Sequence, residues 1–595
     1  MQRPRPMVIA LLAAVPLTCA SAAVGPAATG APRQVDTSPV AVGTGGAVAT
    51  VDADATRIGL EVLRKGGNAV DAAVAAAAAL GVTEPYSAGI GGGGFFVYYA
   101  AATGEVHTID GRETAPQAMQ SDAFVEDGAR IPFGEAVSSG LSVGVPGTPE
   151  TWDVALDTWG TLDLEQALKP AAQLARRGFV VDETFQSQTA ANASRFDDFT
   201  STTELFLPGG APPEPGTIFR NRDLAATYDV MSRHGVDVLY TGEVADDIVA
   251  TVQEPPVAPG VERTVRSGRM ELADLEGYTA PMREPTVVSY RGLDVYGMAP
   301  PSSGGSTVGE ALNIIEAELP DDASETRVLH TYLEASALAF ADRNRYVGDS
   351  DYVDVPLAEL LSDGFAAERA CLVDPEQALP KPVAPGMPDG SYDGCGQRGE
   401  IGLEQQPGQS TTHLTTADAY GNVVAYTLTF EATGGSGIVV PDRGFLLNNE
   451  LTDFTFTDTQ GGADPNLPGP GKRPRSSMSP TIVIADGEPL LALGSPGGST
   501  IITTVLQTLL NRIELGMTLP EAVAAPRASQ RNTTSVLAEP GFDTAGLLEL
   551  GHSFSSTSEI GAATGIELLP DGRLQAVAEP ERRGGGSAGV VTPTP

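Results

Sequence analysis

The chain has 595 residues, of which 41% are hydrophobic, enough for a large buried core. Its 36 basic residues stand against 76 acidic ones, and the resulting formal charge of -40 repels nucleic acids and anionic membranes. We therefore exclude both as partners. After the N-terminal segment no run approaches the length of a transmembrane helix, so the sequence predicts no membrane span.

The N-terminus has the order of a secretory signal. Arg3 and Arg5 precede an apolar run at 7–17, and small residues follow at 20–22. We expect residues 1–22 to be a signal peptide that is removed on export. The mature protein is then expected to be secreted or periplasmic.

Three cysteines bear on this expectation. A lipid anchor at Cys19 is disfavoured, because Pro16 stands where such signals usually carry leucine. Cys371 and Cys395 remain in the mature chain, and in an oxidising compartment they can pair or stay as free thiols. The sequence leaves both alternatives open.

Helical and strand-like patterns alternate along the rest of the chain. Residues 23–45, rich in Ala, Gly, Pro and Thr, predict a flexible leader. Asp54 is a candidate N-cap for a helix that ends near Lys65, and an apolar helix at 69–80 should be buried all round. Strands are expected at 95–100, 286–290, 411–416, 423–430, 444–448, 481–485 and 490–494, and further helices at 149–158, 164–177, 222–235, 308–318, 327–345 and 499–515. This interleaving predicts an α/β sandwich followed by a Gly/Pro/Thr-rich tail.

Residues 375–410 interrupt these patterns. The segment is rich in Pro, Gly and Gln and has no apolar period. A structureless segment of this length inside a compact domain usually marks a functional lid or a linker. We expect it to be flexible.

Two glycine motifs have the wrong context for the chemistry they suggest. The run GIGGGG at 89–94, with Asp110 some twenty residues later, satisfies the dinucleotide pattern, but a helix precedes it and a strand follows. The run GLSVG at 140–144 satisfies the nucleophile-elbow pattern, but Pro146 and Gly147 exclude the helix that must follow the serine. We interpret both as packing features.

The sequence also predicts no metal site and no cofactor. The histidines show no metal-ligand spacing and are interpreted as surface residues or hydrogen-bonded core residues. They are His107, His234, His330, His413 and His552. An acidic loop with Asp349, Asp351 and Asp354 lacks the glycine and the terminal glutamate of an EF-hand.

Thr411 begins a strand-like run directly after the segment 375–410. A threonine run alone indicates only a strand. Here, however, the hydroxyl of Thr411 can attack the carbonyl of its own preceding peptide bond, and scission after Ser410 would make Thr411 a new N-terminus. Its α-amine, with an ordinary pKa of about 7.7–8.0, could then act as the base for its own hydroxyl. We therefore predict self-cleavage before Thr411.

Dense motifs in one order resemble γ-glutamyltransferases, also called glutathione hydrolases. The motifs similar to the family's large subunit are GGNAVDAAVAAAAALGVTEPYSAGIGGGGFF (66–96), IDGRETAP (109–116), SVGVPGTPETW (142–152), PPSSGGST (300–307) and ALAFADRNRYVGDSDYV (337–353). Those similar to the small subunit are TTH (411–413), DAYGNVVAYTLT (418–429), GFLLNNELTDF (444–454), GKRPRSSMSPTIV (471–483) and GSPGGSTII (494–502). The resemblance implies an N-terminal nucleophile hydrolase with a four-layer αββα sandwich, cut once by itself into a large subunit, 46–410, and a small catalytic subunit, 411–595.

The resemblance also implies catalytic roles. Thr411 corresponds to the nucleophile that attacks the γ-amide of glutathione or another γ-glutamyl compound, and Thr429 corresponds to the threonine whose hydroxyl lies beside it. Gly497 and Gly498 correspond to the backbone donors of the oxyanion hole. Two N–H groups just before a helix also suit a developing negative charge on physical grounds.

A γ-glutamyl substrate carries an α-carboxylate and an α-ammonium, so its site needs both signs of charge. The resemblance implies that Arg112 binds the carboxylate, as the planar guanidinium suits. Ser476 and Ser477 correspond to hydroxyls that share that carboxylate. Glu450 and Asp453 correspond to the residues that hold the ammonium.

The chain departs from the family pattern at several points. Glu431 stands two residues after Thr429, where well-studied members have asparagine, and adds a third carboxylate around the ammonium. Repulsion among the three should raise the pKa of at least one. Arg475, in place of the usual leucine, is a candidate compensating cation. Residues 455–471 form a shorter loop without tyrosine, which predicts a site open to larger substrates.

The resulting prediction is an exported γ-glutamyl hydrolase and transpeptidase that passes the acyl group to water or to an amino-acid or peptide acceptor. Its protein partners are the large and small subunits of one precursor. Two alternatives remain: a glutaryl acylase of the cephalosporin type, which the extra carboxylate Glu431 keeps open, and a non-catalytic secreted binding protein on the same scaffold.

Overall fold

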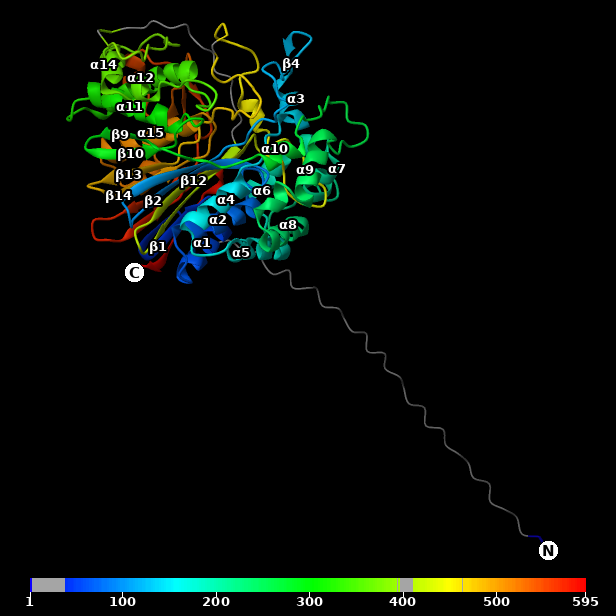
Figure 1. The fold of residues 1–595 in the computed structure, drawn as a ribbon. Helices are drawn as coiled ribbons and strands as arrows, with labels where there is room; N and C mark the ends of the chain where they lie inside the picture. The colour runs from blue at the N-terminus through cyan, green and yellow to red at the C-terminus, as the bar shows by residue number, and fades with distance from the viewer. Residues whose placement is uncertain (3–37, 393, 396–409, 463, 595) are drawn as a thin grey trace.

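A computed structural model describes residues 1–2, 38–392, 394–395, 410–462 and 464–594 (Figure 1). In this part of the chain a long antiparallel sheet is covered by helices on its outer faces. Its strands follow the order β8 (Met282–Arg283), β3 (Glu105–Gly111), β2 (Gly93–Ala100), β12 (Val423–Glu431), β11 (Ser410–Asp418), β1 (Val40–Thr50), β19 (Leu574–Val577), β18 (Thr564–Leu568), β14 (Glu488–Gly494), β13 (Thr481–Ala485), β10 (Leu293–Gly297) and β9 (Thr286–Tyr290), and β20 (Ser587–Pro593) pairs with β1.

β1 is the strand at which this sheet turns from one layer into the other. Its residues 40–43 pair with β19, whereas its residues 46–49 pair with β11. Gly45 and Gly46 lie at the junction with φ of 84° and 125°, values that favour glycine. The two halves of the sheet then face each other across an apolar cluster drawn from β1, β2, β12, β13, β14 and β18.

This turn corrects the predicted leader, which extended over residues 23–45. Residues 40–45 belong to β1, and their glycines serve the turn of the sheet rather than a flexible tail.

Helices cover the outer face of each half of the sheet. Against the half that contains β2, β12 and β11 lie α1 (Ala53–Arg64), α2 (Ala69–Thr83), α4 (Thr148–Trp159), α5 (Leu164–Arg177) and α8 (Arg222–His234), with α3 (Phe133–Val137), α6 (Glu183–Phe196), α7 (Thr200–Phe206), α9 (Glu243–Gln253) and α10 (Leu272–Glu276) nearby. Against the half that contains β14, β13 and β10 lie α11 (Gly304–Glu318), α12 (Glu325–Tyr346) and α15 (Thr500–Ile513), with α13 (Leu357–Leu360), α14 (Asp363–Ala370), α16 (Leu519–Ala524) and α17 (Ala545–Glu549) at the rim. The fold is therefore the expected four-layer αββα sandwich.

The first two helices show how local sequence sets the layers. α2 is buried along its whole length, as its apolar composition predicted. α1 begins after Asp52, whose carboxylate accepts a hydrogen bond of 2.8 Å from the Ala55 N–H. The predicted cap, Asp54, is wrong by two residues. It lies in the first turn instead, where a negative charge is also favourable.

Other differences from the predicted elements lie in the loops and near the C-terminus. The stretch 444–448 is not a strand; it carries one isolated bridge, between Val439 and Leu446. The tail is folded, because its short strands complete both layers of the sheet and form a small sheet of β15 (Ala528–Ser529), β16 (Val536–Ala538) and β17 (Phe554–Ser556). The glycines and prolines of this region made its strand pairing hard to predict from the sequence.

The predicted flexible segment 375–410 is described only in part. Its residues 396–409 lie outside the described residues, as do residues 3–22 of the predicted signal peptide. Cys371 and Cys395 form a disulfide, with their Cα atoms 5.4 Å apart. Among the described helices none is long and apolar enough to cross a membrane.

Candidate active site

Thr411 and Thr429 lie side by side on β11 and β12, near the centre of the sheet. Both are buried. The antiparallel ladder pairs Thr412 with Leu428, but its register shifts between Ser410 and Thr412. Thr411 therefore stands at an irregularity of the ladder.

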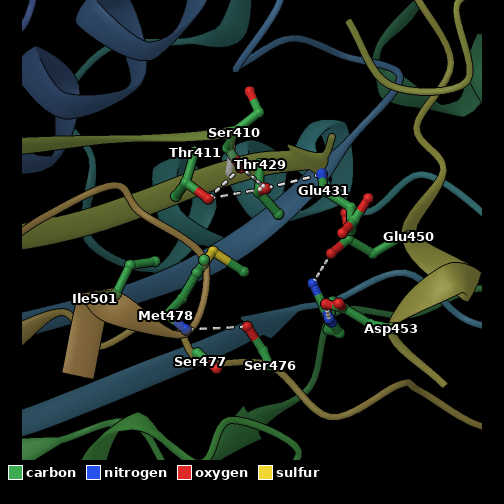
Figure 2. A pocket seen from close by; sticks show the side chains of 12 residues that line it. Ser410, Thr411, Thr429, Glu431, Glu450, Asp453, Ser476, Ser477, Met478 and Ile501 are labelled. Atoms are coloured by element: carbon green, nitrogen blue, oxygen red, sulfur yellow. Dashed lines mark hydrogen bonds and ion pairs between the residues drawn. The ribbon is translucent and has the colours of Figure 1, made fainter. Parts of the chain in front are cut away.

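The hydroxyl groups of the two threonines converge on one carbonyl (Figure 2). Thr429 Oγ1 donates a hydrogen bond of 2.8 Å to the carbonyl oxygen of Ser410 and lies 3.1 Å from Thr411 Oγ1. Thr411 Oγ1 also donates to the Ser410 carbonyl oxygen. The peptide bond between Ser410 and Thr411 thus has a hydroxyl nucleophile at its carbonyl and a second hydroxyl that polarises it.

A hollow opens beside these hydroxyl groups. It brings together every predicted site residue except Gly497. Its lining residues are Arg112, Ser410, Thr411, Thr429, Glu431, Glu450, Asp453, Ser476, Ser477, Met478, Gly498 and Ile501. Residues far apart in the sequence therefore meet at one place.

The glycine pair lies at the N-terminal end of α15. Gly497 and Gly498 have φ of 137° and 58°, in the region that favours glycine. Ser499 follows as the N-cap of α15. Within the described part of the chain neither glycine N–H donates a hydrogen bond, so both can serve an anion. Gly497 lines an adjoining hollow that also contains Arg583.

Arg112 is fully buried and contacts the acids at the far end of the hollow. Its guanidinium forms an ion pair with Glu450 and another, of 2.5 Å, with Asp453, while its Nε donates to the carbonyl of Pro474. Burial alone would lower the pKa of Arg112, but Glu450, Asp453 and Glu113 raise it above its ordinary value. The residues that the resemblance assigns to the two charges of a substrate thus pair with each other here.

Glu431 is held at the end of β12. Its φ of 76° is unusual for a residue other than glycine, and its N–H donates a hydrogen bond of 2.9 Å to Thr429 Oγ1. Asn449 donates its side-chain amide to the Glu431 carboxylate. This anchoring fixes a carboxylate beside the hydroxyl groups of Thr411 and Thr429.

Burial and neighbouring acids together shift the pKa of Glu450. Burial raises the pKa of Glu450 well above its ordinary value; Arg112 opposes this shift, whereas Glu113, Asp453 and Glu431 reinforce it. The direction agrees with the expectation, although burial is the largest cause of the shift and repulsion among the acids only adds to it.

Glu113 is an additional acid that sequence reasoning missed. It is fully buried next to Arg112, and burial raises its pKa to about 8. Neither of its carboxylate oxygens has a hydrogen-bond partner among the described residues. Its position directly after Arg112 in the IDGRETAP motif was the available signal, but adjacency does not tell which way a side chain points.

Arg343 contacts the serine pair and is, after Glu113, the second residue of the site that the sequence did not single out. Arg343, on the buried helix α12, donates a hydrogen bond of 2.8 Å to Ser477 Oγ. Ser476 lies on the same wall of the hollow. Arg475, the predicted compensating cation, donates to the carbonyl oxygens of Arg343 and Val347. Arg343 is one of several charged residues on α12, so the sequence carried no signal that singled it out.

The two glycine motifs have the packing roles expected of them. The glycines at 89–94 connect α2 to β2, with Gly93 and Gly94 inside the strand. Ser142 is fully buried in a 3₁₀ turn, and its hydroxyl donates to the carbonyl oxygens of Val137 and Ser139. Ser142 is therefore not presented to a substrate.

The structure brings two histidines together that no sequence spacing connected. His330 Nδ1 and His552 Nε2 are 2.8 Å apart, and both residues lie near the buried Glu334, with which Lys381 forms an ion pair. Burial lowers the pKa of His552 to about 3. These contacts form a buried network that joins His330 and Glu334 on α12 to Lys381 and His552. This fits the interpretation of both histidines as hydrogen-bonded core residues.

The fold and the site together define a class of protein. A buried threonine near the start of a central strand of an αββα sandwich, with a second hydroxyl and two glycine N–H groups nearby, is the arrangement of an N-terminal nucleophile hydrolase.

Comparisons with known proteins give the family within this class. The family model for gamma-glutamyltranspeptidase matches residues 55–589. The chain is 40% identical over 565 residues to the glutathione hydrolase proenzyme of Bacillus subtilis strain 168, covering 93% of this chain and 92% of the relative, and 36% identical over 549 residues to that of Escherichia coli K12, covering 90% of each. A crystal structure of cephalosporin acylase from Bacillus halodurans superposes with a TM-score of 0.81 at 28% identity, covering 93% of this chain and 97% of that one.

The chain therefore belongs to the gamma-glutamyltranspeptidase family. It is an enzyme, a γ-glutamyl hydrolase or transpeptidase of the N-terminal nucleophile class.

Proposed function

We propose that the chain cleaves itself between Ser410 and Thr411. The observation that carries this proposal is the convergence of the Thr411 and Thr429 hydroxyl groups on the carbonyl of Ser410. Attack by Thr411 Oγ1 on that carbonyl forms an ester as the C–N bond breaks and frees the α-amine of Thr411, and water then hydrolyses the ester to give the Ser410 carboxylate and the free Thr411 hydroxyl. The products are the large subunit, which ends at Ser410, and the small subunit, 411–595.

The new α-amine then acts as base for the hydroxyl of its own residue. Thr411 Oγ1 attacks the γ-carbonyl of the substrate, and the N–H groups of Gly497 and Gly498 stabilise the oxyanion. The leaving amine departs with the proton, which leaves a γ-glutamyl ester on Thr411. Water, an amino acid or a peptide then takes the acyl group.

The charged end of the hollow suits the α-carbon groups of a γ-glutamyl compound such as glutathione. We propose that Arg112, with Ser476 and Ser477, binds the substrate's α-carboxylate. Glu450 and Asp453, both in contact with Arg112 in this structure, are the proposed ligands of the α-ammonium. An arriving substrate then exchanges the two ion pairs of Arg112 within the protein for pairs with its own carboxylate and ammonium.

A matched pair of variants tests the role of Thr411. Thr411→Ala should remain one polypeptide and lose activity by at least about a thousandfold, since the nucleophile is gone. Thr412→Ala is the control, because Thr412 points to the other face of β11 and its hydroxyl has no partner among the described residues. The control should cleave and turn over normally; a Thr411→Ala protein that still cleaves and turns over would refute the proposal.

The rival donor is a glutaryl group, which has no α-ammonium. The similarity to a cephalosporin acylase structure keeps this donor under consideration. Release of a chromophore from γ-glutamyl and glutaryl anilides separates the two. We expect γ-glutamyl to be preferred by about tenfold or more, because removing the ammonium leaves buried carboxylates without their partner. A preference for glutaryl would reverse the assignment.

Export is part of the same proposal. The predicted signal peptide at 1–22 places the enzyme outside the cytoplasm. The disulfide between Cys371 and Cys395 supports this location, since disulfides persist in oxidising compartments. Mass spectrometry of protein collected from culture medium or periplasm should find an N-terminus after residue 22.

A further inference from the structure

The wall of the hollow that carries Ser476 and Ser477 is fastened to the loop before α11. The N–H and the Oγ of Ser303 both donate to the carbonyl oxygen of Ser476, at 2.8 Å and 2.6 Å, and Ser302 Oγ donates to the carbonyl oxygen of Met478 at 2.6 Å. These bonds hold the backbone of the wall in place. They leave the hydroxyl groups of the serine pair to other partners.

Arg343 reaches the same wall from α12 and is buried. Its Nε donates a hydrogen bond of 3.0 Å to Ser303 Oγ, and its Nη2 donates one of 2.8 Å to Ser477 Oγ. The planar guanidinium thus spans the two hydroxyl groups as a fork, and its Cζ lies over the ring of Phe340, 5.5 Å from the centroid. Ser477 therefore faces a donor that is fixed in position.

These contacts determine where the protons of the two serine hydroxyl groups can point. A hydroxyl group has one proton and can accept two hydrogen bonds, whereas arginine only donates. Ser477 Oγ therefore accepts from Arg343, and its own proton must point away from the guanidinium. Ser476 Oγ likewise accepts, from the N–H of Met478 at 3.1 Å (Figure 2). Both serines line the hollow, so both protons can be donated to an anion bound there.

We propose that Arg343 is a positioning residue that directs the Ser477 hydroxyl to donate to the substrate's α-carboxylate; this rests on the proposed function. Its effect is a preference for a carboxylate over a carboxamide of the same shape. A carboxylate accepts from both serines, whereas the NH2 group of a carboxamide brings donors against donors. Arg343 is not among the described residues that line the hollow, so it acts through Ser477 and not by contact with the substrate.

The test uses the cleaved enzyme and two acyl donors that differ only in one group on the α-carbon. One donor is a γ-glutamyl anilide, and the other carries a carboxamide in place of the α-carboxylate. We expect the wild-type kcat/KM to be at least about a hundredfold higher for the carboxylate, because charge-assisted hydrogen bonds are lost with the amide. Arg343→Met should lower this ratio about tenfold, mainly by raising the KM for the γ-glutamyl donor, since the carboxylate is bound alike before and during acyl transfer.

A double-mutant cycle shows whether Arg343 acts through Ser477. Ser477→Ala removes the hydroxyl group and should by itself lower the ratio about tenfold. In the Ser477→Ala background, Arg343→Met should then change the ratio by less than about twofold, because no hydroxyl group remains to be oriented. Losses that multiply in the double variant would show that Arg343 acts independently of Ser477 and would overturn the proposal.

Arg345→Met is the matched control. Arg345 lies two residues further along α12 and carries the same charge, but its Nη1 donates to the side chain of Gln460, so the ratio should stay within about twofold of wild type. Ser303→Ala decides the question if Arg343→Met does not yield folded enzyme. It removes the hydroxyl that accepts from Arg343 Nε, keeps the charge, and should lower the ratio about threefold.

The outcomes separate this proposal from the function on which it rests. If the wild-type enzyme releases no aniline from the γ-glutamyl donor, or releases it equally well from both donors, the proposed function itself fails. If the wild type discriminates but Arg343→Met, or Ser303→Ala in its place, keeps the wild-type ratio while both rates fall alike, then Arg343 only supports the fold and the proposal alone is refuted.

Discussion

Arg112 and Arg369 are both fully buried and both face carboxylates, but they lie in different surroundings. Arg369 is in the core between α12 and α14, where its Nε lies 2.8 Å from the Asp342 carboxylate. Glu310 lies close to Asp342, and burial raises the pKa of both acids. Arg112 faces Glu450 and Asp453 at the wall of an open hollow.

An excess of buried carboxylates has different consequences in the core and at the wall of the hollow. In the core, burial raises the pKa of Glu310 and of Asp342 and Arg369 opposes both shifts, so the partners of this cluster lie within the protein. At the hollow, Glu113, Asp453 and Glu431 raise the pKa of Glu450 in the same way, but the space beside these acids admits a ligand. Under the proposed function, the ammonium group of a substrate relieves the repulsion among the acids of the second cluster.

Replacing each arginine should have the largest effects and tests whether the two clusters differ in function. Arg112→Met and Arg369→Met should each destabilise the uncleaved Thr411→Ala protein by about 3–5 kcal/mol, because each leaves buried acids without a partner. Urea unfolding measures this loss. In the cleaved enzyme, Arg112→Met should lower kcat/KM at least about a hundredfold, since a charge-assisted bidentate contact is lost.

Arg369→Met is the control for that activity loss. It should leave the KM for a γ-glutamyl anilide within about twofold of wild type, because Arg369 lies outside the hollow. Equal losses of kcat/KM in both variants would show that the two clusters do not differ in function.

Glu113 gives the next largest effect, as a dependence of stability on pH. Its folded pKa of about 8 lies above the ordinary value of 4.5, so between these values the folded state binds more protons than the unfolded state. Stability should therefore fall as pH rises from 4.5 to 8, by up to about 1.4 kcal/mol per pH unit. Urea unfolding of the Thr411→Ala protein at a series of pH values measures the slope.

Glu113→Gln should flatten that decline, because the neutral amide does not titrate. Glu165→Gln, a change at an exposed position of α5, should leave the slope unaltered. A slope that survives Glu113→Gln would place the titration elsewhere.

Glu431→Asn should have the smallest effect of the three, on preference rather than on cleavage. We expect self-cleavage to continue and the ratio of γ-glutamyl to glutaryl hydrolysis to change by about tenfold or less, since one of several carboxylates near the ammonium is removed. Gel electrophoresis measures cleavage, and the two anilides measure preference. Equal loss of cleavage and hydrolysis would indicate that Glu431 mainly supports the fold around Thr429.

Much of the site was predictable because its residues are carried by short motifs with a chemical reason. Thr411 could be singled out because a strand begins directly after a segment without apolar period. Gly497 and Gly498 came from the resemblance, and their place before a helix gave it physical support. The layered fold followed from alternating periods and from the resemblance.

What could not be predicted depends on contacts between distant parts of the chain. The side chains of Glu113 and Arg343 are buried next to the site. The neighbouring residues in the sequence do not determine in which direction these side chains point. The turn of the sheet at Gly45 and Gly46 looked like a flexible leader, because the same glycines serve a tail and a sharp change of direction equally well. The pairing of Arg112 with Glu450 and Asp453 required their positions in space.

The most direct test of the central claim is the N-terminal sequence of the smaller fragment of the purified protein, measured together with its γ-glutamyl hydrolase activity. The proposal predicts that the fragment begins with Thr411 and that activity appears in step with its formation. Full activity in an uncut chain, or in a chain cut at another bond, would contradict it.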